Sequence, residues 1–133
     1  MKLTASAADS SAGVRSDERR YPSATVQTTD ATVTTIQTIQ VEANNLVVHV
    51  EADVAAFKSS TGVAATYRLL ACFKRVAGVT TMVASSLTSL EDAAAATWTV
   101  TTTNSGTSIV IQVTGIIGDT VDWKCWVSSW AKA

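Results

Sequence analysis

The chain has 133 residues, enough for one domain with an arm but too few for two hydrophobic cores. Hydrophobic residues make up 47% and charged residues 16%, so we expect a packed core, and a wholly disordered chain is excluded. The sequence holds 21 Thr, 17 Val and 6 Ile. Side chains branched at Cβ favour strands, which excludes a helical bundle. The net charge of -1 attracts neither a phosphate backbone nor an anionic bilayer, so we expect no nucleic-acid and no membrane partner.

The two cysteines indicate neither a disulfide framework nor a zinc site. Cys72 and Cys125 have no second cysteine and no histidine at the spacing of a metal site. The first six residues are followed by no apolar segment, and no run reaches the roughly 18 apolar residues of a membrane span. We therefore expect a soluble, unprocessed protein without a cofactor, in a reducing or indifferent compartment.

The first 25 residues differ from the rest in composition. They are rich in Ser and Ala, contain the only proline, Pro22, and show no apolar period of 2 or 3.6. This composition predicts an extended N-terminal arm at 1–25 and a β-domain at 26–133. The arm is either a disordered tail or a segment that a partner surface holds, and we expect the second. Its candidate partner-binding residues are Arg15, Arg19, Arg20 and Tyr21.

Two long segments predict neighbouring strands. In 45–57 the apolar side chains from Leu46 to Ala56 fall on one face, and His49, Glu51 and Asp53 fall on the other. In 64–77 the apolar residues again alternate with polar ones. The Ser-Ser-Thr-Gly sequence between the two segments is typical of a turn.

The remaining segments predict shorter strands. Gly78 interrupts an apolar run and indicates a tight hairpin leading into a strand at 79–83. Ile36 and Ile39 are three residues apart, so a bulge near Gln37 and Thr38 is needed for both to face the core. Only 90–96 could be helical, and it is too short to be stable alone. Further strands are expected at 97–103, 108–114 and 119–128. The fold class is therefore all-β, an antiparallel β-sandwich or jelly roll of about seven or eight strands.

No pattern in the sequence indicates catalysis. His49 is the only histidine, and along a strand it lies about 7 Å and 14 Å from Glu51 and Asp53, too far apart for ligands that must lie about 2 Å from one metal ion. A solvated sheet face explains the three residues. Neither a nucleophile elbow nor a phosphate-binding glycine loop is present.

Two pairs of carboxylates remain as candidates for acid–base chemistry. They are Glu91 with Asp92, and Asp119 with Asp122. Adjacent acids in turns are more often solvated loop residues. We therefore expect that the protein is not an enzyme.

Strand alternation also places the two thiols. Cys125 shares a face with Trp123 and Val127, whereas Cys72 shares one with Arg68 and Lys74. Thiols on opposite faces cannot form a disulfide, so we predict two free cysteines.

Several apolar side chains fall on otherwise polar faces. They are Leu70, Cys72, Trp126 and Trp130. Either a second sheet or the arm covers them within one subunit, or they form an oligomer interface, because buried Trp with nearby Arg is typical of interface cores. Exposed Trp126, Trp130 or Tyr21 could instead stack against a saccharide, as in a carbohydrate-binding module.

Ordered motifs across 28–128 resemble those of small β-domains in virion proteins of tailed bacteriophages. The motifs are TTDATVTTIQTI at 28–39, YRLLACFKR at 67–75 followed by Gly78, Glu91-Asp92 before Trp98, VTG at 113–115 and VDWKC at 121–125. The resemblance implies a sandwich that serves assembly or surface attachment, and it carries over no catalytic residue.

From these observations we expect a capsid decoration or cement protein that binds the outer head surface through its arm and an oligomer base. Its partners would be the major capsid protein or other virion proteins, together with further copies of itself, with a trimer favoured. Its location would be the virion, assembled in the host cytoplasm. The alternatives are a tail, neck or fibre component and, from another class, a carbohydrate-binding module.

Overall fold

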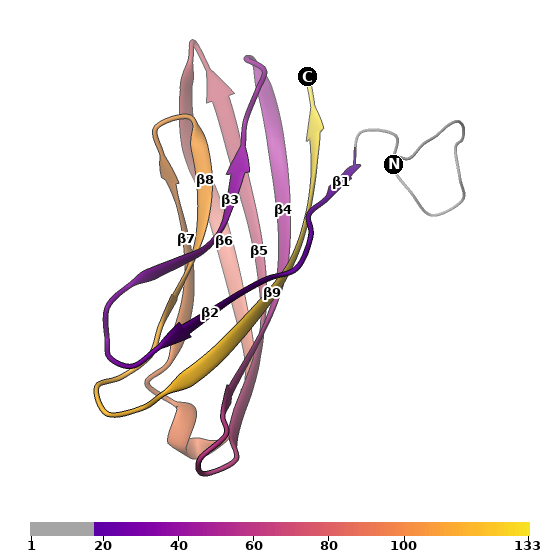
Figure 1. Ribbon diagram of the computed structural model, residues 1–133. Helices are drawn as coiled ribbons and strands as arrows, with labels where there is room; N and C mark the ends of the chain where they lie inside the picture. The colour runs from indigo at the N-terminus through magenta and orange to yellow at the C-terminus, as the bar shows by residue number, and fades with distance from the viewer. Residues whose placement is uncertain (1–17) are drawn as a thin grey trace, which may run out of the picture.

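The computed structural model describes residues 18–133. Over this range it contains nine strands and one short 3-10 helix (Figure 1). The elements are β1 (Glu18–Arg20), β2 (Ala24–Thr28), β3 (Thr34–Gln40), β4 (Leu46–Lys58), β5 (Val63–Val76), β6 (Val79–Glu91), η1 (Ala93–Ala95), β7 (Thr99–Ser105), β8 (Ser108–Thr114) and β9 (Val121–Lys132). Within the same range, no helix is long and apolar enough to cross a membrane.

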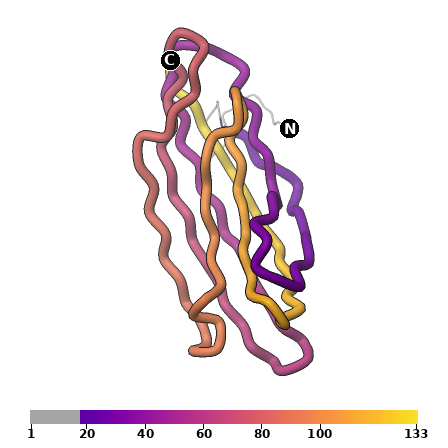
Figure 2. The backbone as a smooth tube through the Cα atoms, turned by 90° about the vertical axis from the view of Figure 1, so that its left-hand side faces the viewer, coloured from indigo at the N-terminus to yellow at the C-terminus, as the bar shows by residue number. Residues whose placement is uncertain are grey.

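The strands form two antiparallel sheets, neither of which closes into a barrel. In the large sheet the order is β1-β9-β4-β5-β6, with β2 also paired to β9, and in the small sheet it is β3-β8-β7. The chain crosses between the sheets four times: from β2 to β3, β3 to β4, β6 to β7 and β8 to β9. In Figure 2 the small sheet lies in front of the large sheet. The all-β prediction is confirmed.

One hydrophobic core lies between the sheets. Alternate residues of β4, β5 and β9 point inward and meet the inward residues of β3, β7 and β8. The largest of these fully buried side chains are Trp123, Phe73, Ile39, Ile109 and Ile111. The period of two read from the sequence therefore places the core correctly in the long strands.

Local features predicted from the sequence appear close to their expected positions. Val76 pairs with Val79, so Ala77 and Gly78 form a two-residue turn in which both have positive φ. The pairing of β3 with β8 shifts register between Thr35 and Gln37, which allows Ile36 and Ile39 both to be buried.

Three elements have boundaries that differ from the prediction by more than two residues. The strand expected at 79–83 is β6, which continues to Glu91, and the helix considered at 90–96 is reduced to Ala93–Ala95. β9 runs on to Lys132. The residues that extend β6 are mostly Ser, Thr and Ala on an exposed edge, where burial imposes no hydrophobic alternation.

Part of the segment predicted as an arm is built into the large sheet. β1 pairs with β9 from Glu18 opposite Trp130, and β2 pairs with β9 from Ala24 opposite Cys125. The backbone amide of Tyr21, between them, donates to the carbonyl oxygen of Val127. Residues 18–25 therefore follow the surface of their own domain, and the rest of the predicted arm lies outside the described residues.

Candidate functional site

The outer face of the large sheet, turned away from the small sheet, carries most of the side chains singled out from the sequence. Strand register aligns residues of β9, β4 and β5 in rows across this face. The rows are Trp130–His49–Cys72, Ser128–Glu51–Leu70 and Trp126–Asp53–Arg68. The four residues predicted as an interface thus lie on one surface, although the sequence separates them by up to 60 positions.

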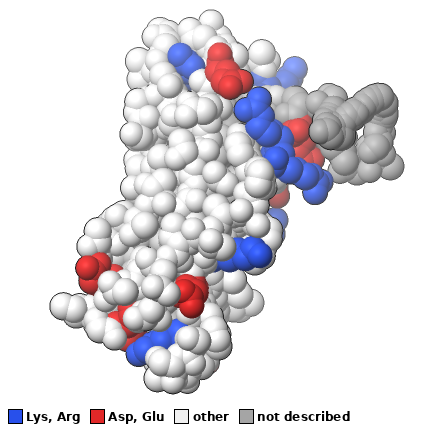
Figure 3. Space-filling view, in the orientation of Figure 1, with Lys and Arg blue, Asp and Glu red and all other residues white. Residues whose placement is uncertain are grey.

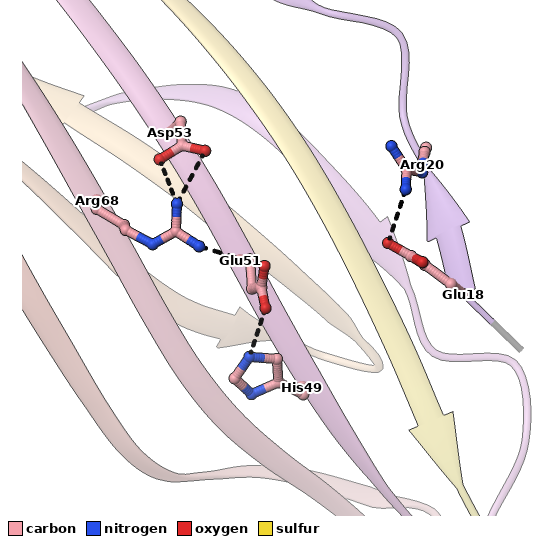
Figure 4. A network of polar contacts seen from close by, with 6 residues as sticks. All are labelled: Glu18, Arg20, His49, Glu51, Asp53 and Arg68. Atoms are coloured by element: carbon pink, nitrogen blue, oxygen red, sulfur yellow. Dashed lines mark hydrogen bonds and ion pairs between the residues drawn. The ribbon is translucent and has the colours of Figure 1, made fainter. Parts of the chain in front are cut away.

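A polar network runs along the middle of the outer face (Figure 4). Arg68 reaches from β5 to both carboxylates of β4, at 3.2 Å from Asp53 and 3.5 Å from Glu51. The other oxygen of Glu51 lies 3.3 Å from Nε2 of His49, and the His49 ring packs against Trp130 at 5.2 Å between centroids. The guanidinium therefore compensates two neighbouring negative charges.

This network gives no metal site. Glu51 turns toward His49, but Arg68 occupies the space between the two carboxylates. Within the described residues, no group of three or more His, Cys, Asp and Glu side chains is placed to hold a metal ion. The outer face is a charge-paired surface that has polar groups on β4 and the aromatic rings of Trp126 and Trp130 beside them on β9.

Trp126 is the most exposed aromatic ring of the outer face apart from Phe57. It is 45% exposed and stands between two shallow hollows. One, of about 370 Å³, is lined by Asp53, Thr66, Arg68, Thr88 and Leu90, and the other, of about 700 Å³, by Gln27, Ala55, Phe57, Asp122 and Lys124. The ammonium group of Lys124 lies 5.4 Å from the centre of the Trp126 ring. A partner surface of complementary shape can therefore pack around the projecting Trp126 ring and fill the two hollows.

The other predicted interface residues are partly covered. Leu70, Cys72 and Trp130 are each half-buried by their neighbours on the outer face. The small sheet packs on the opposite side and covers none of them. Their role in an oligomer stays a prediction.

The predicted partner-binding residues of the arm contact their own domain where they are described. Arg19 lies 3.5 Å from Glu42, and Arg20 lies 3.6 Å from Glu18. The ring of Tyr21 packs beside the core. Arg15 lies outside the described residues. Contact of these residues with a partner stays a prediction.

The two cysteines are free, as the alternation of β5 and β9 predicted. Cys72 lies on the outer face opposite His49, whereas Cys125 is fully buried in the core. Burial, together with the negative charge of Asp53, raises the pKa of the Cys125 thiol to about 12, so this thiol is protonated at neutral pH. Neither sequence spacing nor composition indicated that Cys72 and His49 would be neighbours.

The predicted carboxylate pairs do not converge. Asp92 accepts a hydrogen bond from the backbone amide of Ala64, while Glu91 is the last residue of β6. Asp122 accepts a hydrogen bond from the side-chain amide of Gln27. Asp119 lies 2.7 Å from Nζ of Lys58 and accepts from the indole of Trp98 at 3.3 Å. Asp92, Asp119 and Asp122 thus make contacts between different segments of the chain and do not face a common site.

Asp119 gives a prediction about pH. The hydrogen bond from Lys58 holds the pKa of this carboxyl below its ordinary value of 3.8, and the Trp98 indole adds to the effect. The ionised form thus stabilises the folded state above that value, and the stabilisation is lost as the pH falls through the folded-state pKa. Asp119→Asn should lower the thermal midpoint of unfolding by a few degrees at neutral pH. This difference from wild type should become smaller when the pH falls below 3.8.

Thermal unfolding followed by circular dichroism from neutral to acid pH checks this expectation. Asp122→Asn is the matched control, because Asp122 is exposed and its side chain is held by the neutral amide of Gln27. A constant difference between Asp119→Asn and wild type across the whole pH range would contradict the assignment.

The small sheet contrasts with the outer face of the large sheet. β3, β7 and β8 contain no Asp, Glu, Lys or Arg. In the view of Figure 3, charged side chains lie at the two ends and along one side of the molecule, and the rest of the middle is uncharged. The charge pairs and the exposed Trp126 are thus concentrated on the other layer.

Comparisons with known proteins give partial structural likenesses. Neither a protein-family model nor a curated protein sequence matches the chain. The tailspike protein of Acinetobacter baumannii phage AM24 is 12% identical with a TM-score of 0.43, over 83% of this chain and 26% of that one. The tailspike protein of Acinetobacter phage vB_ApiP_P1 is 14% identical with a TM-score of 0.40, over 98% of this chain and 25% of that one. The chain thus spans about a quarter of each tailspike, and no residue role is carried over from either.

Proposed function

We propose that the chain is a non-enzymatic structural protein of a tailed-bacteriophage virion, and that its outer face is the contact surface for neighbouring virion subunits. In this proposal the two sheets form a β-sandwich that serves as an assembly module. The ordered motifs between 28 and 128 support the virion class, because they resemble β-domains of phage structural proteins. The outer face supports the role in assembly.

The observation that carries the proposal is the exposure of Trp126 beside a charge-paired network. An aromatic ring flanked by hollows, with an arginine in the same cross-strand row, has the composition of an interface centre. Arg68 is already held by Asp53 and Glu51, so it is fixed in position before a partner binds. Covering these groups requires little ordering of side chains.

A tail, neck or fibre position suits the structure better than capsid decoration. Decoration of a shell was expected to use the arm at 1–25 together with an oligomer base, but residues 18–20 and 24–25 of that arm pair with β9 of the domain itself. A contact made by the outer face needs no free arm. Capsid decoration remains the second location within the same proposal.

The proposal predicts that Trp126→Ala weakens association while the subunit stays folded. Truncation of an aromatic hot spot typically costs 2 kcal/mol or more of binding, about a thirtyfold loss of affinity. Sedimentation equilibrium over a concentration series measures the loss, and circular dichroism checks the fold. Ile117→Ala is the control, because Ile117 is also exposed but lies in the loop between β8 and β9.

Saccharide binding is the second candidate function, and the open hollows on both sides of Trp126 favour it. The same variant separates the two. Suppose that Trp126→Ala leaves the mass of the oligomer unchanged but abolishes saccharide binding to the purified protein. The proposed assembly role of this face is then wrong, and the chain is a carbohydrate-binding module instead.

A further inference from the structure

The free edge of the large sheet is formed by β6. Within the described residues, β6 pairs with β5 and with no other strand, and every residue from Thr81 to Glu91 is exposed. Figure 2 shows this strand running along one side of the molecule. One row of backbone amide and carbonyl groups therefore faces outward over most of a 13-residue strand.

This edge lacks most of the features that prevent strands from pairing with other chains. From Val79 to Leu90 its sequence is VTTMVASSLTSL, without a charged residue or a proline. Its one irregularity is a shift of register beside Val83, which leaves the segment from Ala84 onward regular. The opposite edge is divided into β1 and β2, with Pro22 between them and charges at Glu18–Arg20. Of the two edges of the large sheet in the described residues, the β6 edge is the one that is both long and uncharged from Val79 to Leu90.

The core is also open beside β6. Met82 and Leu87 lie opposite Phe73 and Leu69 and share their inward face. Yet Met82 and Leu87 are 39% and 41% exposed, whereas Phe73 and Leu69 are 0% and 2% exposed. The small sheet ends at β7 and leaves these two side chains of β6 exposed. A further strand at this edge would cover both the backbone groups and these two side chains.

We propose that β6 pairs antiparallel with β6 of a second copy of this chain, across a two-fold axis, so that two large sheets become one continuous sheet. A two-fold contact brings the same surface against itself, and an uncharged strand meets no like charge when it does so. With the axis at Leu87, this leucine faces its own copy and Ala84 faces Leu90. Antiparallel pairing is the sense that a two-fold axis imposes, and it is the sense of every pair in the sheet.

The test compares charge insertion at this edge and elsewhere in the full chain. Leu87→Lys places two ammonium groups opposite each other and should weaken dimerisation roughly tenfold or more, measured by sedimentation equilibrium. Thr101→Lys, at an exposed position of the uncharged strand β7, should leave the dimer unchanged. A monomeric wild type, or a dimer that Leu87→Lys does not weaken, would overturn the proposal.

A second variant keeps the test valid if the lysine disturbs folding. Residues directly opposite in an antiparallel pair have Cα atoms roughly 4.5–5.5 Å apart, within the range of a disulfide. Leu87→Cys should therefore give a reducible dimer under mild oxidation, whereas wild type, with Cys72 and Cys125, should not. The absence of this cross-link in a folded Leu87→Cys protein would count against pairing at Leu87.

This contact is separate from the outer-face contact, so the two proposals can fail independently. A dimer weakened by Trp126→Ala but not by Leu87→Lys would retain the proposed function and overturn β6 pairing. A dimer weakened by Leu87→Lys but not by Trp126→Ala would retain β6 pairing and overturn the proposed function of the outer face. Pairing with a different protein predicts that wild type stays monomeric, which also overturns the proposal.

Discussion

Replacing Trp123 with alanine is expected to remove about 3–5 kcal/mol from the free energy of unfolding. Trp123 is 1% exposed and packs between Tyr67 and Trp98, with 6.1 Å between ring centroids on each side. Its indole donates a hydrogen bond of 2.9 Å to the hydroxyl of Thr28. The substitution therefore leaves a large cavity and an unpaired buried oxygen. In a domain with a total stability of about 5–15 kcal/mol, this loss brings the chain close to unfolding.

Urea unfolding followed by far-ultraviolet circular dichroism measures this loss. Trp126→Ala is the matched control, since the same side chain is removed from a surface position, and its unfolding midpoint should stay near that of wild type in dilute solution. Equal losses for Trp123→Ala and Trp126→Ala would show that the core is not centred on Trp123.

Gly115→Ala is expected to cost about 1–3 kcal/mol of stability, although it adds a single methyl group. A Cβ at this position would lie 2.7 Å from the hydroxyl oxygen of Thr28, which is the oxygen that accepts from Trp123. It would also lie 3.3 Å from the carbonyl oxygen of Asp30. Thr28 can make room only by giving up its hydrogen bond or moving its strand.

A double-mutant cycle tests this cause of the Gly115→Ala effect. If the Thr28 hydroxyl is the obstacle, Gly115→Ala should cost less in a Thr28→Ala background than in wild type. Urea midpoints of the four proteins give the interaction free energy. Full additivity of the two substitutions would mean that the strain lies elsewhere in the loop.

Prediction from the sequence succeeded where a strand is buried on one face. β4 and β5 appear at 46–58 and 63–76 because alternate apolar residues mark the core side of each. It failed at both edges of the large sheet. β6 is exposed on both faces, so its Ser and Thr residues carry no burial pattern, and β1 is held by a partner strand more than a hundred residues away.

The sequence predicted which sheet face each residue of the candidate site lies on, but not which of these residues are in contact. Alternation within β5 and β9 placed Leu70, Cys72 and Trp126 on the polar side, as the structure shows. Register between strands decides which of these residues meet, and hairpin geometry fixes register only where two strands are joined by a short turn. The approach of Trp130 to His49 joins β9 to β4, which are distant in sequence, so no local pattern could indicate it.

The pairing of β1 with β9 places the two ends of the described chain at the same end of the domain. Glu18 lies opposite Trp130, so the described chain enters and leaves the fold at neighbouring points (Figure 1). The turn between β4 and β5 lies at the other end of the same strands, because Phe57 pairs with Asp122 at the start of β9. The 12 residues of β9 span about 40 Å. A support that binds β1 or the end of β9 would thus carry the domain as a rigid spacer, with that turn about 40 Å away from the point of attachment.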